Sequence, residues 1–156
     1  MNQMPNLPMQ AFEIKGYGGD CVSLEIGEVF GFPDETSYGG GFGARGQLRI
    51  SAGSYTVSAM HYFTTGELYG FSEALAQCYE RLSGTATLEN TERQLDLSCS
   101  FDRTGHVILT GAFQEYPHSQ NKLIFEIGLD QTFIPSALAQ LRAVAQIFGG
   151  MRGILN

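Results

Sequence analysis

Hydrophobic residues recur at spacings of three and four between residues 64 and 84, which is the period of one face of an amphipathic helix. The residues on that face are Leu68, Phe71, Leu75, Cys78 and Leu82. Thr64 and Glu67 fit a capping box that begins a helix, and Gly84 fits the left-handed residue that commonly ends one. The spacing therefore predicts a helix near residues 66–83.

A second helical stripe lies near residues 133–148 and is followed by two glycines that would stop a helix. Its apolar positions are Ile134, Leu138, Leu141, Val144 or Ala145, and Phe148. Both helices contain the sequence Ala-Leu-Ala-Gln, at residues 74–77 and 137–140. This repeat suggests an internal duplication, although four common helix-forming residues also coincide by chance.

The remaining stretches alternate between apolar and polar residues, which is the pattern of strands with one buried face. Alternating runs begin at Phe12, Val22, Leu48 and Tyr55 before the first helix, and at Ala86, Leu95, Val107 and Leu123 after it. Gly27 interrupts the second run as a bulge would. Short turns make neighbouring strands antiparallel. The order of strands, helix, strands and helix predicts an α+β fold, with antiparallel sheet or sheets and one sheet face covered by two main helices.

Length and composition predict the domain organisation. The chain has 156 residues, of which 43% are apolar, and this suffices for one core, so we expect a single domain over residues 11–156. Residues 1–10 hold two prolines and no periodicity, which predicts a flexible N-terminal arm. Cys21, Cys78 and Cys99 lack metal-ligand spacing and lie in apolar patterns, so we expect three reduced core thiols.

The charge balance narrows the class of partner. Sixteen acidic and nine basic residues give a formal net charge of -7, which disfavours nucleic acid and anionic membranes and favours a basic partner. An acidic balance also simply keeps a protein in solution. The sequence has no secretory signal pattern and no apolar stretch near the ~18 residues that cross a bilayer, so we expect a cytoplasmic protein with no membrane contact.

Motifs for chemistry lack the context that they need. Residues 41–46 spell GxGxxG, but a loop precedes them and a strand follows, whereas dinucleotide binding needs a strand before and a helix after. The three histidines, His61, His106 and His118, have no partner at ligand spacing. Asp34 and Glu35 are neighbours and cannot face each other across the ~5 to 10 Å of a glycosidase pair. We therefore predict no catalytic residue, no metal site and no cofactor.

Two loops combine carboxylates with tyrosines: PDETSY at 33–38 and QEYPH at 114–118. Tyrosine supplies contact area at low entropic cost, and carboxylates accelerate the encounter with a basic partner. The predicted partner-binding residues are Asp34, Glu35, Tyr38, Glu115 and Tyr116. The alternative is that both segments are ordinary solvated loops.

Six segments of the chain resemble the WapI family of immunity proteins, which protect bacteria from the C-terminal domains of wall-associated toxins. They are FPDETSYGGGF at 32–42, TGELYGF at 65–71, CYERLSGTATLEN at 78–90, GHVILTGAFQEYPH at 105–118, NKLIFE at 121–126 and DQTFI at 130–134. The resemblance runs over roughly residues 22–150. Most of these segments are helix caps, strand cores and turns, so they identify a fold family before they identify a mechanism.

The resemblance implies a cytoplasmic, non-enzymatic bacterial protein that binds and neutralises one cognate polymorphic toxin domain, as in other toxin-antitoxin and contact-dependent inhibition systems. Such toxins are often nucleases with basic faces, which suits an acidic immunity protein. Two alternatives stay open. One is a structural or regulatory protein-binding domain of the same fold, and the other is a small hydrolase that uses the loop at 33–38.

Overall fold

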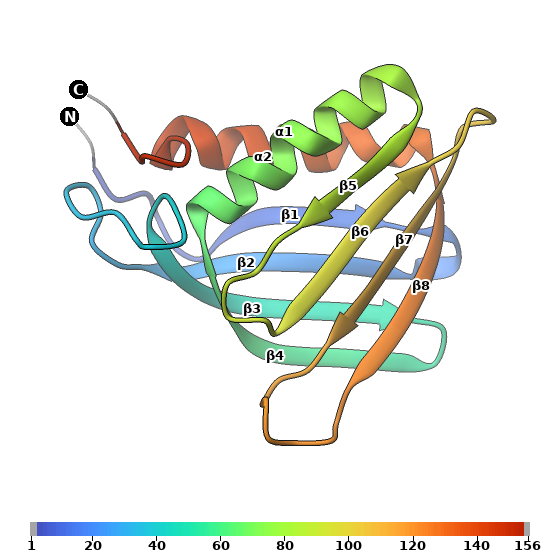
Figure 1. Cartoon of the computed structure of the whole chain (residues 1–156), viewed down its shortest axis with the longest axis horizontal. Helices are drawn as coiled ribbons and strands as arrows, with labels where there is room; N and C mark the ends of the chain where they lie inside the picture. Colours follow the sequence, from blue (N-terminus) through green and yellow to red (C-terminus); the bar gives the residue numbers. More distant parts are fainter. Residues whose placement is uncertain (1–2, 155–156) are drawn as a thin grey trace.

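Two antiparallel four-stranded sheets and two helices make up the computed structural model, which describes residues 3–154 (Figure 1). The first sheet contains, in spatial order, β1 (Met9–Lys15), β2 (Cys21–Val29), β3 (Gly43–Ala52) and β4 (Tyr55–Thr64), and α1 (Thr65–Arg81) follows it. The second contains β5 (Gly84–Leu88), β6 (Leu95–Phe101), β7 (His106–Phe113) and β8 (Leu123–Asp130), and α2 (Ile134–Phe148) follows it. Single-turn helices η1 (Tyr17–Gly19) and η2 (Gln131–Phe133) occupy two connections. The predicted α+β class and the order of its elements are confirmed.

Each half of the chain consists of four strands followed by a helix, and each helix packs on the sheet of the other half. The helix that follows the first sheet, α1, packs along β5 of the second sheet, and α2 packs along β1 of the first (Figure 1). The helices also pack against each other, and the buried residues of both sheets and both helices form one core. The expectation that both helices cover one face of one sheet is therefore wrong, because each apolar stripe lies against a different sheet. Both halves share one topology, which agrees with the suggested duplication.

The ends of α1 confirm one predicted cap and correct the other. Thr64 Oγ1 accepts the Glu67 amide at 3.0 Å, and the Glu67 carboxylate accepts the Thr64 amide at 2.8 Å, which is the predicted capping box. The left-handed residue that ends the helix is Leu82, with φ +53°, and its N–H donates to the carbonyl of Cys78. Gly84 is already the first residue of β5. The helix therefore ends at Leu82, two residues before Gly84, which itself also has a positive φ of +93°.

The predicted bulge and the free cysteines are confirmed, but one of the three cysteines is not in the core. The pairing of β2 with β3 shifts register between Ile26 and Glu28, which confirms the bulge at Gly27. All three cysteines are free, and Cys78 and Cys99 are buried. Burial raises the pKa of Cys99 to about 12. Cys21 is only half-buried, so its prediction as a core thiol is wrong; it is the first residue of β2, where the core ends.

The domain organisation stays a prediction. The first strand begins at Met9, inside the arm predicted for residues 1–10. Residues 1–2 of that arm, and residues 155–156 of the domain predicted for 11–156, lie outside the described residues. Within residues 3–154, no helix is both long and apolar enough to span a bilayer.

Candidate partner-binding surface

The structure places the five predicted site residues on two loops. Asp34, Glu35 and Tyr38 are exposed on the loop at 30–42 between β2 and β3. Glu115 is half-buried and Tyr116 is exposed on the loop between β7 and β8. The end of β4 and the connection from β5 to β6 lie between these loops (Figure 1).

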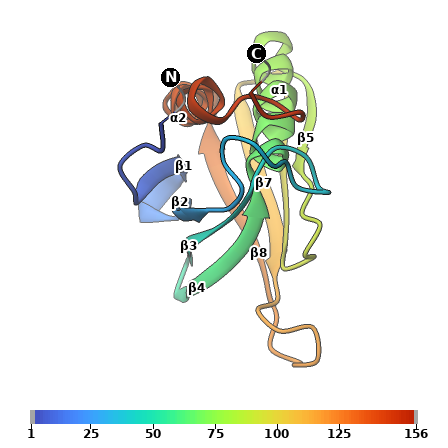
Figure 2. The ribbon, with the colours of Figure 1, turned by 90° about the vertical axis from the view of Figure 1, so that its left-hand side faces the viewer.

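The two loops nevertheless belong to one side of the molecule. We call this side the loop face and define it by residues 30–42, 89–94 and 114–122, together with Tyr62 near the end of β4. Figure 2 turns it toward the viewer, with the β2–β3 loop above β4 and the β7–β8 loop at the bottom. The loop face thus extends across both sheets.

Gln94 joins the centre of the loop face to the end of β4. Its Oε1 atom accepts the Tyr62 amide at 2.9 Å and contacts His61 Nδ1 at 3.1 Å. Its Nε2 atom donates to the Glu115 carbonyl at 3.2 Å. One side chain therefore fixes β4 relative to the β7–β8 loop, and so fixes one sheet relative to the other.

Glu67 and Asn90 hold the β5–β6 connection against the start of α1. Glu67 is buried, and its carboxylate accepts the amides of Thr64 and Thr91. Asn90 Nδ2 lies 3.4 Å from Glu67 Oε1 and donates to the Tyr62 carbonyl at 3.1 Å. A buried carboxylate is stabilised when N–H donors occupy its lone pairs, and these three donors come from the end of β4 and from the β5–β6 connection. These bonds hold the β5–β6 connection against the start of α1.

His61 is a satisfied interior histidine. Its side chain is 1% exposed, stacks on Phe63 with ring centroids 5.7 Å apart, and meets Phe113 edge-on. Burial lowers its pKa from 6.5 to about 4, so the ring is neutral near pH 7. The Gln94 carbonyl oxygen is only an acceptor, so His61 Nδ1 carries the proton that it donates there. This histidine is committed to structure.

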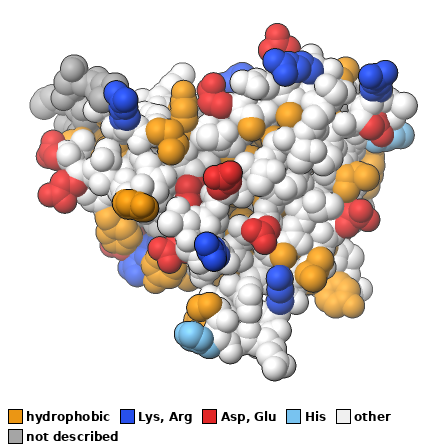
Figure 3. All heavy atoms as spheres, viewed as in Figure 1, with side chains coloured by type: hydrophobic (Ala, Val, Ile, Leu, Met, Phe, Trp, Pro, Cys, Tyr) orange, Lys and Arg blue, Asp and Glu red, His pale blue; other side chains and the backbone are white. Residues whose placement is uncertain are grey.

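Exposed aromatic and acidic side chains dominate the loop face. Exposed fractions are 47% for Phe30, 104% for Tyr38, 44% for Tyr62 and 63% for Tyr116. The charged residues in its three segments are the carboxylates Asp34, Glu35, Glu89, Glu92 and Glu115, and the basic residues Arg93 and Lys122. Figure 3 shows acidic and hydrophobic side chains mingled over the left and centre of the view, with basic side chains scattered singly. Aromatic side chains are enriched at protein interfaces, and a surface with an excess of carboxylates favours the approach of a positively charged partner.

Sequence reasoning missed five residues of this surface: Phe30, Tyr62, Asn90, Glu92 and Gln94. The exposure of Tyr62 could have been predicted from the sequence, because successive strand residues point to opposite faces and its neighbours His61 and Phe63 are buried. Phe30 lies at the end of a strand pattern and reads as core. Asn90 and Gln94 left no signal, because their bonds to Tyr62 and Glu115 join residues more than twenty positions apart.

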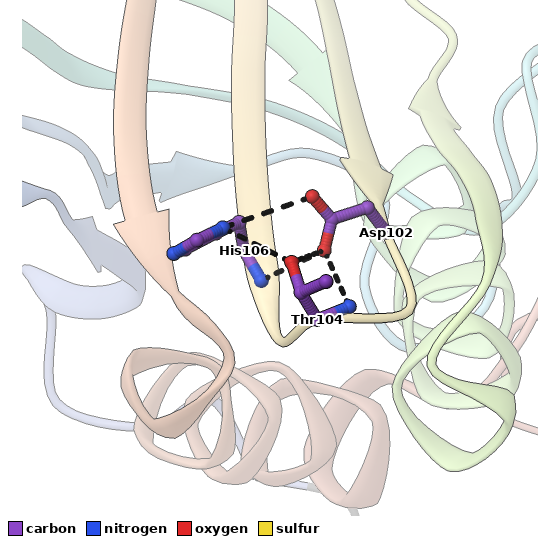
Figure 4. A network of polar contacts seen from close by, with 3 residues as sticks. All are labelled: Asp102, Thr104 and His106. Atoms are coloured by element: carbon purple, nitrogen blue, oxygen red, sulfur yellow. Dashed lines mark hydrogen bonds and ion pairs between the residues drawn. The ribbon is translucent and has the colours of Figure 1, made fainter.

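One polar network has the residue types of a catalytic triad (Figure 4). Asp102 Oδ1 accepts the Thr104 hydroxyl at 2.7 Å and the amides of Thr104 and His106, and these bonds, led by the Thr104 hydroxyl, lower the Asp102 pKa. The Thr104 hydroxyl proton is thus directed at the carboxylate and not at His106, which lies 3.1 Å away. All three side chains are exposed in a hairpin turn. The network caps the turn and does not activate a nucleophile.

Residues 3–154 also contain no candidate cluster of side chains that could bind a metal ion. This part of the chain brings together no group of three or more His, Cys, Asp or Glu residues that could hold a metal ion.

Two antiparallel meandering sheets and two exchanged helices define an α+β protein, and one side of it carries exposed carboxylates and tyrosines. The chain belongs to the Immunity protein WapI-like family, whose family model matches residues 13–149. No curated protein and no solved structure matches the chain. The resemblance found in the sequence is confirmed at the level of the family.

Proposed function

We propose that the protein is an immunity protein that binds the C-terminal domain of one cognate polymorphic toxin and neutralises it without turning over a substrate. The observation that carries this proposal is family membership over residues 13–149, which is most of the chain. The turn-capping role of the Asp102 network supports the non-enzymatic part.

The loop face is the surface that we assign to the toxin. Its predicted residues Asp34, Glu35, Tyr38, Glu115 and Tyr116 are joined there by Phe30, Tyr62 and Glu92. Aromatic anchors with a polar rim are the usual anatomy of a protein interface. The hydrogen bonds of Glu67, Asn90 and Gln94 order the backbone beneath this surface, which reduces the entropy lost on binding.

The toxin in this proposal is basic and has the character of a nuclease. A protein of net charge -7 attracts a cationic domain at long range, and occupation of a basic active-site face would exclude an anionic substrate. The encounter takes place in the bacterial cytoplasm, where a toxin delivered by contact would act.

Co-expression with the toxin domain encoded beside the gene tests the proposal. Cells that produce both proteins should survive, and the two should co-purify as a complex. Survival without a complex would argue for destruction of the toxin or its product, and so for an enzyme. Failure to protect would argue for the structural or regulatory alternative, with another partner.

A further inference from the structure

A small hollow opens on the loop face between the β2–β3 loop, the end of β4 and the β5–β6 connection. Its volume is about 260 Å³, below the ~300–1,000 Å³ of sites for drug-sized ligands, so it suits a single side chain. Three aromatic residues with exposed rings line it: Phe30, Tyr38 and Tyr62. The hollow therefore offers aromatic surface around a side-chain-sized space.

The charged residues that line the hollow are Glu67 and Glu92. Glu67 is bonded by neutral N–H groups of Thr64, Asn90 and Thr91. Among the described residues 3–154, no lysine, arginine or histidine forms an ion pair with either carboxylate. The two carboxylates of the hollow are thus not neutralised by a basic side chain of the described residues.

No lysine or arginine in the described part of the chain lines the hollow, and the arginine on the strand beside Tyr62 has another partner. Arg45 is paired with Tyr62 across β3 and β4, but its guanidinium bonds Glu28 at 2.8 Å. The protein therefore does not fill the hollow with its own arginine.

We propose that this hollow receives an arginine side chain of the toxin domain, an inference that rests on the proposed function. A planar guanidinium can stack on tyrosine rings while the N–H groups at its edge donate to a carboxylate. In this hollow, that carboxylate is Glu92. The hydroxyl groups of Ser37 and Thr91 offer further acceptors. A lysine ammonium is more strongly hydrated and presents no flat surface, so arginine fits these walls better.

A titration without the toxin tests the hollow itself. The probe is N-acetyl-arginine methylamide, and its matched control is the citrulline analogue, which has the same shape and no charge. Amide resonances of Tyr62, Thr91 and Glu92 should shift in a saturable manner with the arginine probe and stay in place with citrulline. Equal shifts with both probes, or no shift at these amides, would overturn the proposal.

Substitutions in the complex with an inactive toxin domain test the mechanism of recognition. Tyr62→Leu and Glu92→Gln should each raise Kd about 5- to 30-fold, whereas Tyr62→Phe keeps the ring and should stay within about twofold. Matched controls are Tyr17→Leu on η1 and Glu126→Gln on β8, both exposed and outside the hollow and the loop face. Equal losses for Tyr62→Phe and Tyr62→Leu would contradict a cation–π contact.

The two proposals fail in different ways. A complex whose affinity is unchanged by Tyr62→Leu and Glu92→Gln would overturn the arginine site and leave the immunity function standing. Absence of protection and of any complex would overturn the immunity function, while the arginine titration would still decide the hollow. Thermal unfolding of each variant separates lost binding from lost folding.

Discussion

At the residue scale, buried and half-buried polar side chains join the two sheets. His61, Glu67, Asn90 and Gln94 connect β4, α1 and the β5–β6 and β7–β8 connections through hydrogen bonds. A buried polar group left without a partner costs about 1 to 3 kcal/mol, and these bonds give partners to His61 and Glu67, which are buried. The arrangement of the loop face depends on them.

The lowered pKa of His61 makes part of the stability depend on pH. The pKa is about 4 in the folded state and about 6.5 in the unfolded state, so the unfolded state binds more protons between these values. The contribution is complete above pH 6.5 and is lost as the pH falls toward 4. It amounts to about 2 to 4 kcal/mol.

The measurement is urea unfolding of His61→Phe and the parent protein at pH 7 and pH 4. His61→Phe should lose about 2 to 4 kcal/mol less than the parent between these values. The control is His118→Gln on an exposed loop, which should lose as much stability as the parent. A His61→Phe protein with the parent's full pH dependence would refute the assignment.

At the element scale, the two helices hold the exchanged halves together. Leu75 on α1 is 0% exposed and Leu138 on α2 is 3% exposed, so each side chain lies in the common core. Leu75→Ala and Leu138→Ala should each lower the free energy of unfolding by about 2 to 5 kcal/mol. Chemical denaturation measures this, with the exposed helix positions Gln77→Ala and Gln146→Ala as controls. Losses no greater than those of the controls would contradict the packing.

The helices and strands could be predicted from the sequence because their signals are local. Apolar spacing and the Thr64–Glu67 box place α1 within two residues of its bounds at Thr65–Arg81. The separation into two sheets could not be predicted, because alternation shows which face of a strand is buried and not which strands pair. The end of α1 is wrongly predicted at Gly84 because a glycine is the usual left-handed residue there. Leu82 takes that conformation although it is not glycine.

At the scale of the whole molecule, charge should govern how fast the partner binds. The carboxylates of Asp34, Glu35 and Glu115 lie on the loop face, so changing all three to amides should slow association about 3- to 10-fold at low salt. Raising the ionic strength should shrink this difference, because exposed charges are screened beyond ~8 to 10 Å. Stopped-flow association with the inactive toxin domain measures both effects.

The matched control changes the same number of charges elsewhere. Glu73 and Glu80 on α1 and Glu126 on β8 are exposed and lie outside the loop face, so their triple amide variant carries the same net charge. It should slow association much less. Equal slowing by both variants would show that net charge alone steers the encounter, and would remove this support for the loop face.

Hydrogen exchange of the protein, alone and bound to the inactive toxin domain, tests most directly the claim that the loop face binds the toxin. Amides in 30–42, 89–94 and 114–122 and at Tyr62 should exchange more slowly in the complex, since an interface excludes water from the backbone that it covers. Protection confined to the outer face of β5–β8 or to the turn at residues 102–105, with these segments unchanged, would contradict it.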